Sequence, residues 1–123
     1  TTGVNKLLFE QGTPLNVETL LGKNLPDGKS RISVIYLNTL QNISEKEFLI
    51  NMVVKELYSW MLQNPSDKLQ ALFYIDEIAP FLPPVRKPAC KDALTLLFKQ
   101  ARKYGILSKF HGNFKNINLD LLI

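Results

Sequence analysis

Two adjacent acids, Asp76 and Glu77, are the residues of this 123-residue chain whose types and spacing best suit chemistry. They directly follow residues 69–75, an apolar run with the composition of a buried strand. In open α/β sheets, ligands bind at the edge formed by the carboxyl ends of the strands. Two neighbouring carboxylates repel each other there, and a bound cation or a proton relieves the repulsion. The pair therefore predicts a cation-dependent site, with Mg²⁺ as the ion.

An apolar strand that ends in Asp-Glu is the Walker B arrangement of P-loop NTPases. In that interpretation, Asp76 helps to hold Mg²⁺, while Glu77 orients and deprotonates the attacking water. A plainer alternative is that Asp76 caps a turn before Pro80 and that Glu77 is merely exposed. The few residues of the motif leave both open, because short motifs often match by chance.

The elements that must position this pair follow from the apolar pattern and the turn signals. Residues 31–38 and 69–75 are short, nearly continuous apolar runs, which are typical of parallel strands covered on both faces. A helix is predicted over residues 45–63 between them, and another over residues 89–104 after a proline-rich loop. Strand, helix and strand make a right-handed βαβ unit. The sequence thus predicts an α/β fold with parallel strands.

Local signals set the ends of these helices. Ser44 and Glu47 have the spacing of a capping box. The Asn-Pro step at Asn64 ends the first helix, because the residue before a proline avoids the helical region. Gly105 is placed to stop the second helix, and a further strand is predicted to begin just after it. Two weaker predictions are a short helix near residues 17–21 and an edge strand at residues 6–9.

A longer stretch around the acidic pair resembles the Walker B region of HerA-like ATPases, in the HerA/FtsK superfamily of P-loop motors. The resemblance lies in LFYIDEIAPFLPP (residues 72–84), KPACKD (87–92) and LFKQARKYG (97–105). A less specific likeness extends over about residues 3–106. The resemblance implies a partial RecA-like P-loop NTPase core. In such a core, Asp76 would be the Mg²⁺-side acid, acting through water, and Glu77 the catalytic glutamate.

The same resemblance implies cofactors and partners. Members bind ATP with Mg²⁺ and typically form ring-shaped hexamers that translocate or unwind DNA, so the parent protein is expected to be a helicase-like hydrolase. Arg102 matches a basic position before the sensor strand and would contact a neighbouring subunit's nucleotide. A plainer alternative for Arg102 is a solvated cation that the helix dipole favours. Self-association or binding to ATPase subunits is expected as well.

The phosphate loop of that family is missing from the sequence. Its pattern is GxxxxGK(S/T), after a strand and before a helix; the nearest text is residues 22–30, which end in Gly-Lys-Ser. Five residues separate its glycines, a proline interrupts it, and a strand is predicted to follow it. We therefore expect a surface turn there. The isolated chain is accordingly expected to hydrolyse no appreciable ATP and to bind neither ATP nor Mg²⁺ stably.

The missing phosphate loop bears on the domain organisation. Residues 1–123 amount to one domain, which is expected to be a fragment of an ATPase core. Residues 106–123 do not continue the apolar sensor strand of the family. They are expected to be a divergent tail, which reflects either a truncated or shifted reading frame or a C-terminus that has diverged from the family.

The charge distribution leaves a second class of function open. Residues 86–123 carry eight basic and two acidic side chains, whereas residues 1–85 carry seven and nine. The alternative to an ATPase fragment is therefore a non-enzymatic interaction or regulatory module that binds DNA through its basic C-terminal third. A solvated lysine-rich face is the plainer interpretation of the same residues.

Composition disfavours several other classes of protein. No apolar run reaches the roughly 18 residues of a membrane span, and no secretory leader is recognisable, so no membrane partner is expected. The single cysteine, Cys90, permits no internal disulfide and suits a reducing, cytoplasmic compartment. Cys90 and His111 make a poor nucleophile and base, because no third group orients the base. A buried cysteine and a surface histidine are the plainer expectation.

Overall fold

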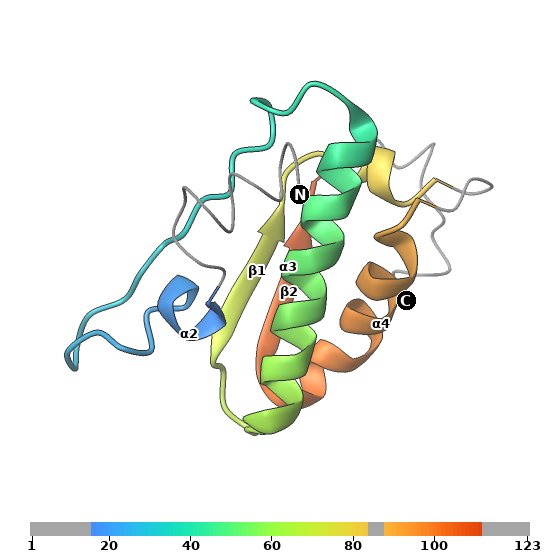
Figure 1. The fold of residues 1–123 in the computed structure, drawn as a ribbon. Coiled ribbons are helices and arrows are strands. Elements are labelled where there is room, and N and C mark those ends of the chain that lie inside the picture. The colour runs from blue at the N-terminus through green and yellow to red at the C-terminus, as the bar shows by residue number, and fades with distance from the viewer. Residues whose placement is uncertain (1–15, 84–87, 112–123) are drawn as a thin grey trace.

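The computed structural model describes residues 16–83 and 88–111 and shows a small mixed α/β arrangement (Figure 1). Its elements are α2 (Val17–Leu20), α3 (Ile43–Gln63), β1 (Ala71–Ile75), the 3₁₀ helix η2 (Ala79–Phe81), α4 (Lys91–Gln100), the 3₁₀ helix η3 (Ala101–Tyr104) and β2 (Ile106–Phe110). The two predicted large helices and the predicted strand at residues 69–75 are confirmed, with slightly shifted ends. Within the described ranges, no helix is long and apolar enough to cross a membrane.

The predictions for the smaller elements have different outcomes. The short helix near residues 17–21 is present as α2, and the strand predicted after Gly105 is present as β2. β2 accounts for the first part of the predicted divergent tail, whose remainder, residues 112–123, lies outside the described part of the chain. The edge strand predicted at residues 6–9 also lies outside it.

The sheet consists of two parallel strands within the described residues. β1 and β2 pair in register, from Ala71 opposite Ile106 to Ile75 opposite Phe110. Their connection runs through η2, α4 and η3. The βαβ unit in the structure is therefore β1–α4–β2, one step further along the chain than the predicted unit.

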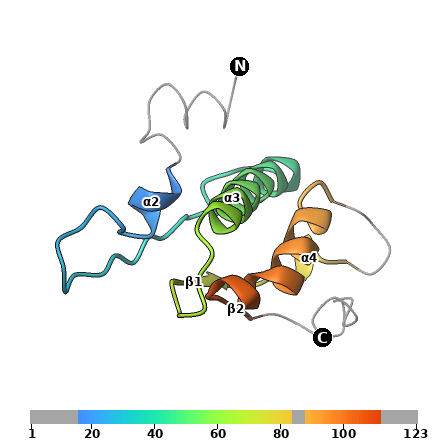
Figure 2. The same ribbon diagram turned by 90° about the horizontal axis from the view of Figure 1, so that it is seen from below.

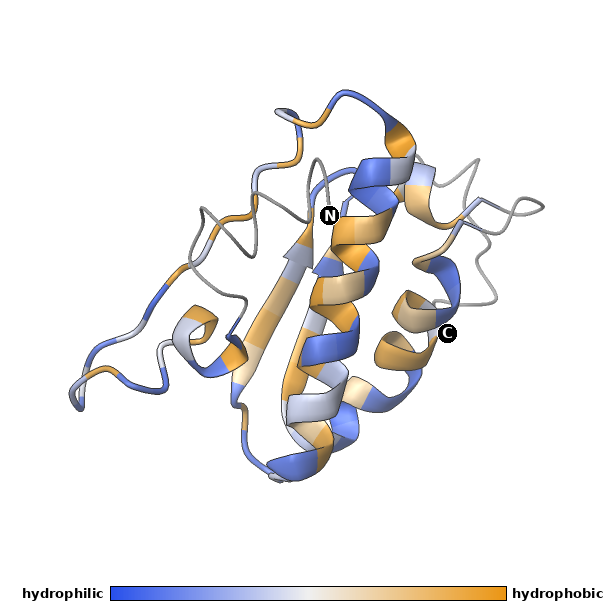
Figure 3. Cartoon of the chain, in the orientation of Figure 1, coloured by the Kyte–Doolittle hydropathy of each residue, from blue (hydrophilic) through white to orange (hydrophobic). Residues whose placement is uncertain are grey.

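Residues 31–38, predicted to be a parallel strand, form none. They pair with neither β1 nor β2, and Ile32 is 92% exposed; Figure 3 shows hydrophobic residues along this outer segment. Side-chain hydrogen bonds tie the segment to α2 instead: Arg31 Nη1 donates to the Thr19 carbonyl at 2.9 Å, and Ser33 Oγ to the Leu20 carbonyl at 2.6 Å. An apolar, β-branched run favours a strand only where packing and a partner strand support it, and here neither does.

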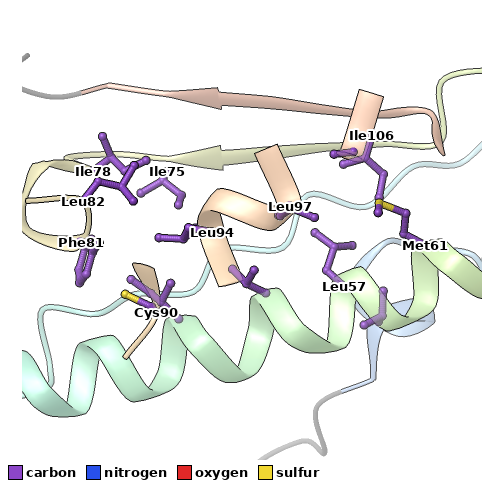
Figure 4. Packing of buried hydrophobic residues seen from close by; sticks show 14 residues of the cluster. Leu57, Met61, Ile75, Ile78, Phe81, Leu82, Cys90, Leu94, Leu97 and Ile106 are labelled. Carbon is purple, nitrogen blue, oxygen red and sulfur yellow. The ribbon is translucent and has the colours of Figure 1, made fainter. Parts of the chain in front are cut away.

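Helices α3 and α4 both cover the same face of the sheet (Figures 1 and 2). Along each strand, exposed residues alternate with half-buried or buried ones, as expected for a sheet covered on one face. Leu72, Tyr74 and Leu107 are accordingly exposed, so the opposite face is bare within the described residues. The core lies between helices and sheet (Figure 4). Its buried members are Val17, Ile50, Val54, Leu57, Met61, Ile75, Ile78, Phe81, Leu82, Cys90, Leu94, Leu97, Ala101 and Ile106.

Asn42 caps the first turn of α3. The capping-box spacing predicts Ser44 as the cap, and this prediction is wrong. Asn42 has extended backbone angles, and its Oδ1 accepts a hydrogen bond from the Glu45 N–H at 2.8 Å. Asparagine caps as well as serine does, so the helix begins two residues before the predicted cap would allow. The stop at Gly105 is confirmed, because this residue adopts the left-handed conformation, with φ of 76°, directly after η3.

This cap gives a prediction that separates the two sequence signals. Replacing Asn42 by alanine should lower the free energy of unfolding by about 1 kcal/mol, because the Glu45 N–H loses its acceptor. Replacing Ser44 by alanine, the matched control, should change it by less than about 0.5 kcal/mol. Urea denaturation followed by circular dichroism measures both. A larger loss for the Ser44 variant would show that the predicted capping box forms in solution.

Candidate functional site

The two acids lie where the sequence predicted them, directly after β1 at the carboxyl edge of the sheet. The Asp76 side chain is 80% exposed, and Glu77 is exposed as well. Because β1 and β2 are parallel, the residue that follows β2 emerges at the same edge. That residue is His111, for which the sequence alone predicts only a surface histidine.

His111 lies beside Asp76. Its Nδ1 is 3.5 Å from Asp76 Oδ1, and both side chains are open to solvent. The main chain fixes this placement: the His111 N–H donates to the Ile75 carbonyl at 3.0 Å, and the His111 carbonyl accepts from the Ile78 N–H at 2.9 Å. The strand pairing thus continues one residue beyond Ile75 and Phe110, and it sets an imidazole against the first of the two acids.

Glu77 occupies an unusual backbone conformation between these two hydrogen bonds. Its φ is 59°, in the left-handed region, where a side chain other than glycine is uncommon. The chain turns sharply there, and Ile78 next to it is fully buried. Phe81 and Leu82, which follow, are also buried, so the core holds the far side of this acidic turn in place. Outliers of this kind persist where the surrounding structure enforces them, and they cluster at functional sites.

A second anchor holds the loop that follows the acids. Lys91, at the start of α4, is buried and donates from Nζ to the Pro83 carbonyl at 2.6 Å. This hydrogen bond ties the end of the described loop to the helix, because a buried ammonium group needs a partner. The loop between β1 and α4 is therefore fixed at Ile78, Leu82 and Pro83, while its acids stay exposed.

The edge can supply part of a magnesium site. Within residues 16–83 and 88–111, no group of three or more His, Cys, Asp or Glu side chains could hold a metal ion. Mg²⁺, however, keeps several waters and is usually held by one or two carboxylates together with substrate phosphates. The solvent-exposed carboxylate of Asp76 fits such a water-mediated role. The residues present do not fit a metal site built from protein ligands alone.

Arg102 does not join this group within one chain. It is exposed on η3, which precedes β2, whereas Asp76 and His111 follow the strands. The five residues of β2 separate the two ends of the sheet by about 16 Å, at about 3.3 Å per residue. Only a contact with another subunit could bring Arg102 to a nucleotide, and that part of the prediction stays open.

The structure bears on two other sequence predictions. Residues 22–30 form a surface turn, as expected: the Lys29 N–H donates to the Pro26 carbonyl at 3.2 Å, and no helix follows. This segment therefore lacks the helix N-terminus that cradles phosphate in a P-loop. Cys90 is fully buried in the core, as the plainer expectation had it, and His111 is exposed at the sheet edge.

The described part of the basic third is largely solvated. Lys99, Arg102, Lys103 and Lys109 are exposed, whereas Lys91 is buried and engaged with Pro83.

Comparisons with protein-family models, with curated proteins and with solved structures found no match for this chain. The likeness to HerA-like ATPases thus stays a prediction that rests on the residues quoted for it.

Proposed function

We propose that this chain carries the acidic half of the nucleotide site of a HerA/FtsK-like ATPase, built on part of a RecA-like core. The observation that carries the proposal is the position of Asp76 and Glu77 at the carboxyl edge of a parallel strand pair. This edge is where α/β sheets bind ligands. The sequence resemblance between residues 70 and 105 supplies the reaction class, which is ATP hydrolysis coupled to DNA translocation or unwinding.

The two acids have separate roles in this proposal. Asp76 orients a hydrated Mg²⁺ through its exposed carboxylate, and His111 at 3.5 Å restricts the orientation of that carboxylate. Bound Mg²⁺ would neutralise charge on the nucleotide's phosphates. Glu77 acts as general base: it orients the attacking water and accepts its proton.

The chain alone is expected to hydrolyse no appreciable ATP. The 123 residues contain no phosphate-loop pattern, and residues 22–30 form a turn. Without a cradle of N–H groups, the β- and γ-phosphates are not fixed against the acids, and catalysis of phosphoryl transfer is almost entirely positioning and electrostatic stabilisation. Asp76 and Glu77 then have no ordered substrate to act on.

The experiment is a titration of the ¹⁵N-labelled chain with Mn²⁺, which takes the same oxygen ligands as Mg²⁺ and broadens nearby amide signals. The amide signals of Asp76, Glu77 and His111 should broaden first, and Asp76→Asn should abolish this preference. Asp67→Asn is the matched control, because Asp67 is also exposed but lies before β1. In parallel, ATP turnover by the unmodified chain should stay at the buffer background.

Two results would contradict the proposal in different ways. Broadening that spreads over all exposed acids, or that survives Asp76→Asn, would show that the strand edge is no cation site. Multiple turnover of ATP that Glu77→Gln removes would show instead that the chain is a complete enzyme, and would refute its expected inactivity.

A further inference from the structure

A groove of about 320 Å³ lies between α3 and α4, away from the acids. Val54 and Tyr58 of α3 line it, together with Ala89, Ala93 and Leu96 from α4 and the turn before it. The two alanines explain the hollow, because their methyl groups are too short to fill the space between the helices. Leu96 is also exposed, although large apolar side chains are usually buried. The groove is thus an apolar surface that the described chain leaves open.

A polar atom in the groove has no partner. Asn51, on α3, has its Oδ1 buried from solvent, and no described residue donates a hydrogen bond to it. A buried acceptor without a donor costs free energy, about 1–3 kcal/mol.

The charges of the groove are arranged in opposition across it. Lys55 lies on α3 and Asp92 on α4, and both are exposed at the groove. Neither has an ion-pair partner among the residues that the structure describes. A surface with one positive and one negative side is complementary to itself when it meets its own copy through a two-fold axis.

We infer that this groove is the interface with a second copy of the chain. In a two-fold arrangement, Lys55 of each copy meets Asp92 of the other, so two ion pairs form from one pattern. The exposed Leu96 of each copy enters the space that the alanines leave in the other. This inference does not depend on nucleotide hydrolysis.

The exposed face of the sheet is another apolar surface, but it does not identify its partner. Leu72, Tyr74 and Leu107 are exposed there without any charged pair that would select an occupant. The groove is different, because its two opposite charges, Lys55 and Asp92, match what a second copy of the same chain carries.

The test uses two charge reversals, Lys55→Asp and Asp92→Lys, in the full chain. Sedimentation equilibrium of the unmodified chain should give a dimer of the 14.0 kDa protomer. Each reversal alone creates two like-charge contacts by symmetry and should weaken dimerisation at least about tenfold. An equimolar mixture of the two variants should dimerise again, because every contact then joins opposite charges. The double reversal in one chain should dimerise as well.

Recovery in the mixture separates this interface from a contact within one chain. If Lys55 and Asp92 acted within one protomer, only the double variant would recover, and the inference would fail. Asp67→Lys and Lys68→Asp, at exposed positions outside the groove, change the net charge equally and should leave the dimer intact. A monomeric unmodified chain would overturn the inference. So would a dimer that withstands both groove reversals and is lost on Leu72→Lys.

Discussion

Replacing Gly105 by alanine should lower the free energy of unfolding by about 3 kcal/mol or more. Gly105 has a φ of +76°, in the left-handed region that costs a side-chain-bearing residue about 1–2 kcal/mol. An added Cβ would also overlap the backbone carbonyl oxygen of Lys68, which is not the end of a flexible side chain. The segment before β1 must therefore shift to make room. Urea denaturation with circular dichroism measures the loss.

The matched control for this variant is Gly28→Ala. Gly28 has a similar φ of +82°, but an added Cβ would meet no atom within 4 Å. This substitution should cost only the conformational penalty of about 1–2 kcal/mol. Equal losses for the two variants would show that the close approach of Gly105 to Lys68 does not exist in solution.

The same glycine sets the geometry of the candidate site. The Gly105 carbonyl accepts hydrogen bonds from the N–H groups of Gln70 and Ala71, at 2.6 and 3.3 Å. These bonds fix the register with which β1 and β2 begin, and five residues later that register sets His111 against Asp76. The alanine variant should therefore also move the amide signals of His111, although this residue lies at the other end of the strand.

The helices and the strand before Asp76 were predictable because their signals are local. Pro65 after Asn64, Gly105 after the second helix, and the apolar spacing within each helix act through neighbouring residues alone. The position of the acids at a strand end followed from the same signals. The cap of α3 was wrong by two residues, since Asn42 and Ser44 are both good caps and only the structure shows which one binds Glu45.

That residues 31–38 form no strand was not predictable in the same way. The apolar, β-branched residues of this segment favour extended structure, but a strand also needs a partner strand, and local sequence does not reveal whether one is present. The sequence pattern also does not show that the helices cover only one face of the sheet. The run at residues 69–75 looks continuous, yet Leu72 and Tyr74 lie on the bare face.

The position of His111 beside Asp76 was not predicted, because it depends both on the length of β2 and on its register with β1. Ser108 and Lys109 interrupt the apolar run after Gly105, so the strand was predicted to fade where the structure continues it to Phe110. Residues 106–110 read Ile-Leu-Ser-Lys-Phe, without strict alternation of apolar and polar residues, so the alternation of buried and exposed positions along β2 is visible only in the structure. The pairing with Asp76, however, depends on the register between β1 and β2, which no local pattern encodes.

A substitution in the core beneath these strands should lower the free energy of unfolding about as much as the substitution of Gly105 does. Leu97 is 0% exposed on α4 and belongs to the cluster between helices and sheet (Figure 4). Replacing it by alanine removes buried methyl groups and leaves a cavity, which should cost about 3 kcal/mol of unfolding free energy. Small domains have only about 5–15 kcal/mol in total. The loss is therefore a large fraction of the total, and the variant should unfold at a clearly lower temperature.

The control for Leu97→Ala is Leu62→Ala, the same change at a position on α3 that is 46% exposed. It should cost at most about 1 kcal/mol, because roughly half of that side chain is already in water. Thermal denaturation at low protein concentration, which keeps any dimer dissociated, measures both variants. Leu97→Ala should therefore cost more unfolding free energy than Leu62→Ala. Equal costs would show that the packing of α4 against the sheet does not hold β2 and His111 in place.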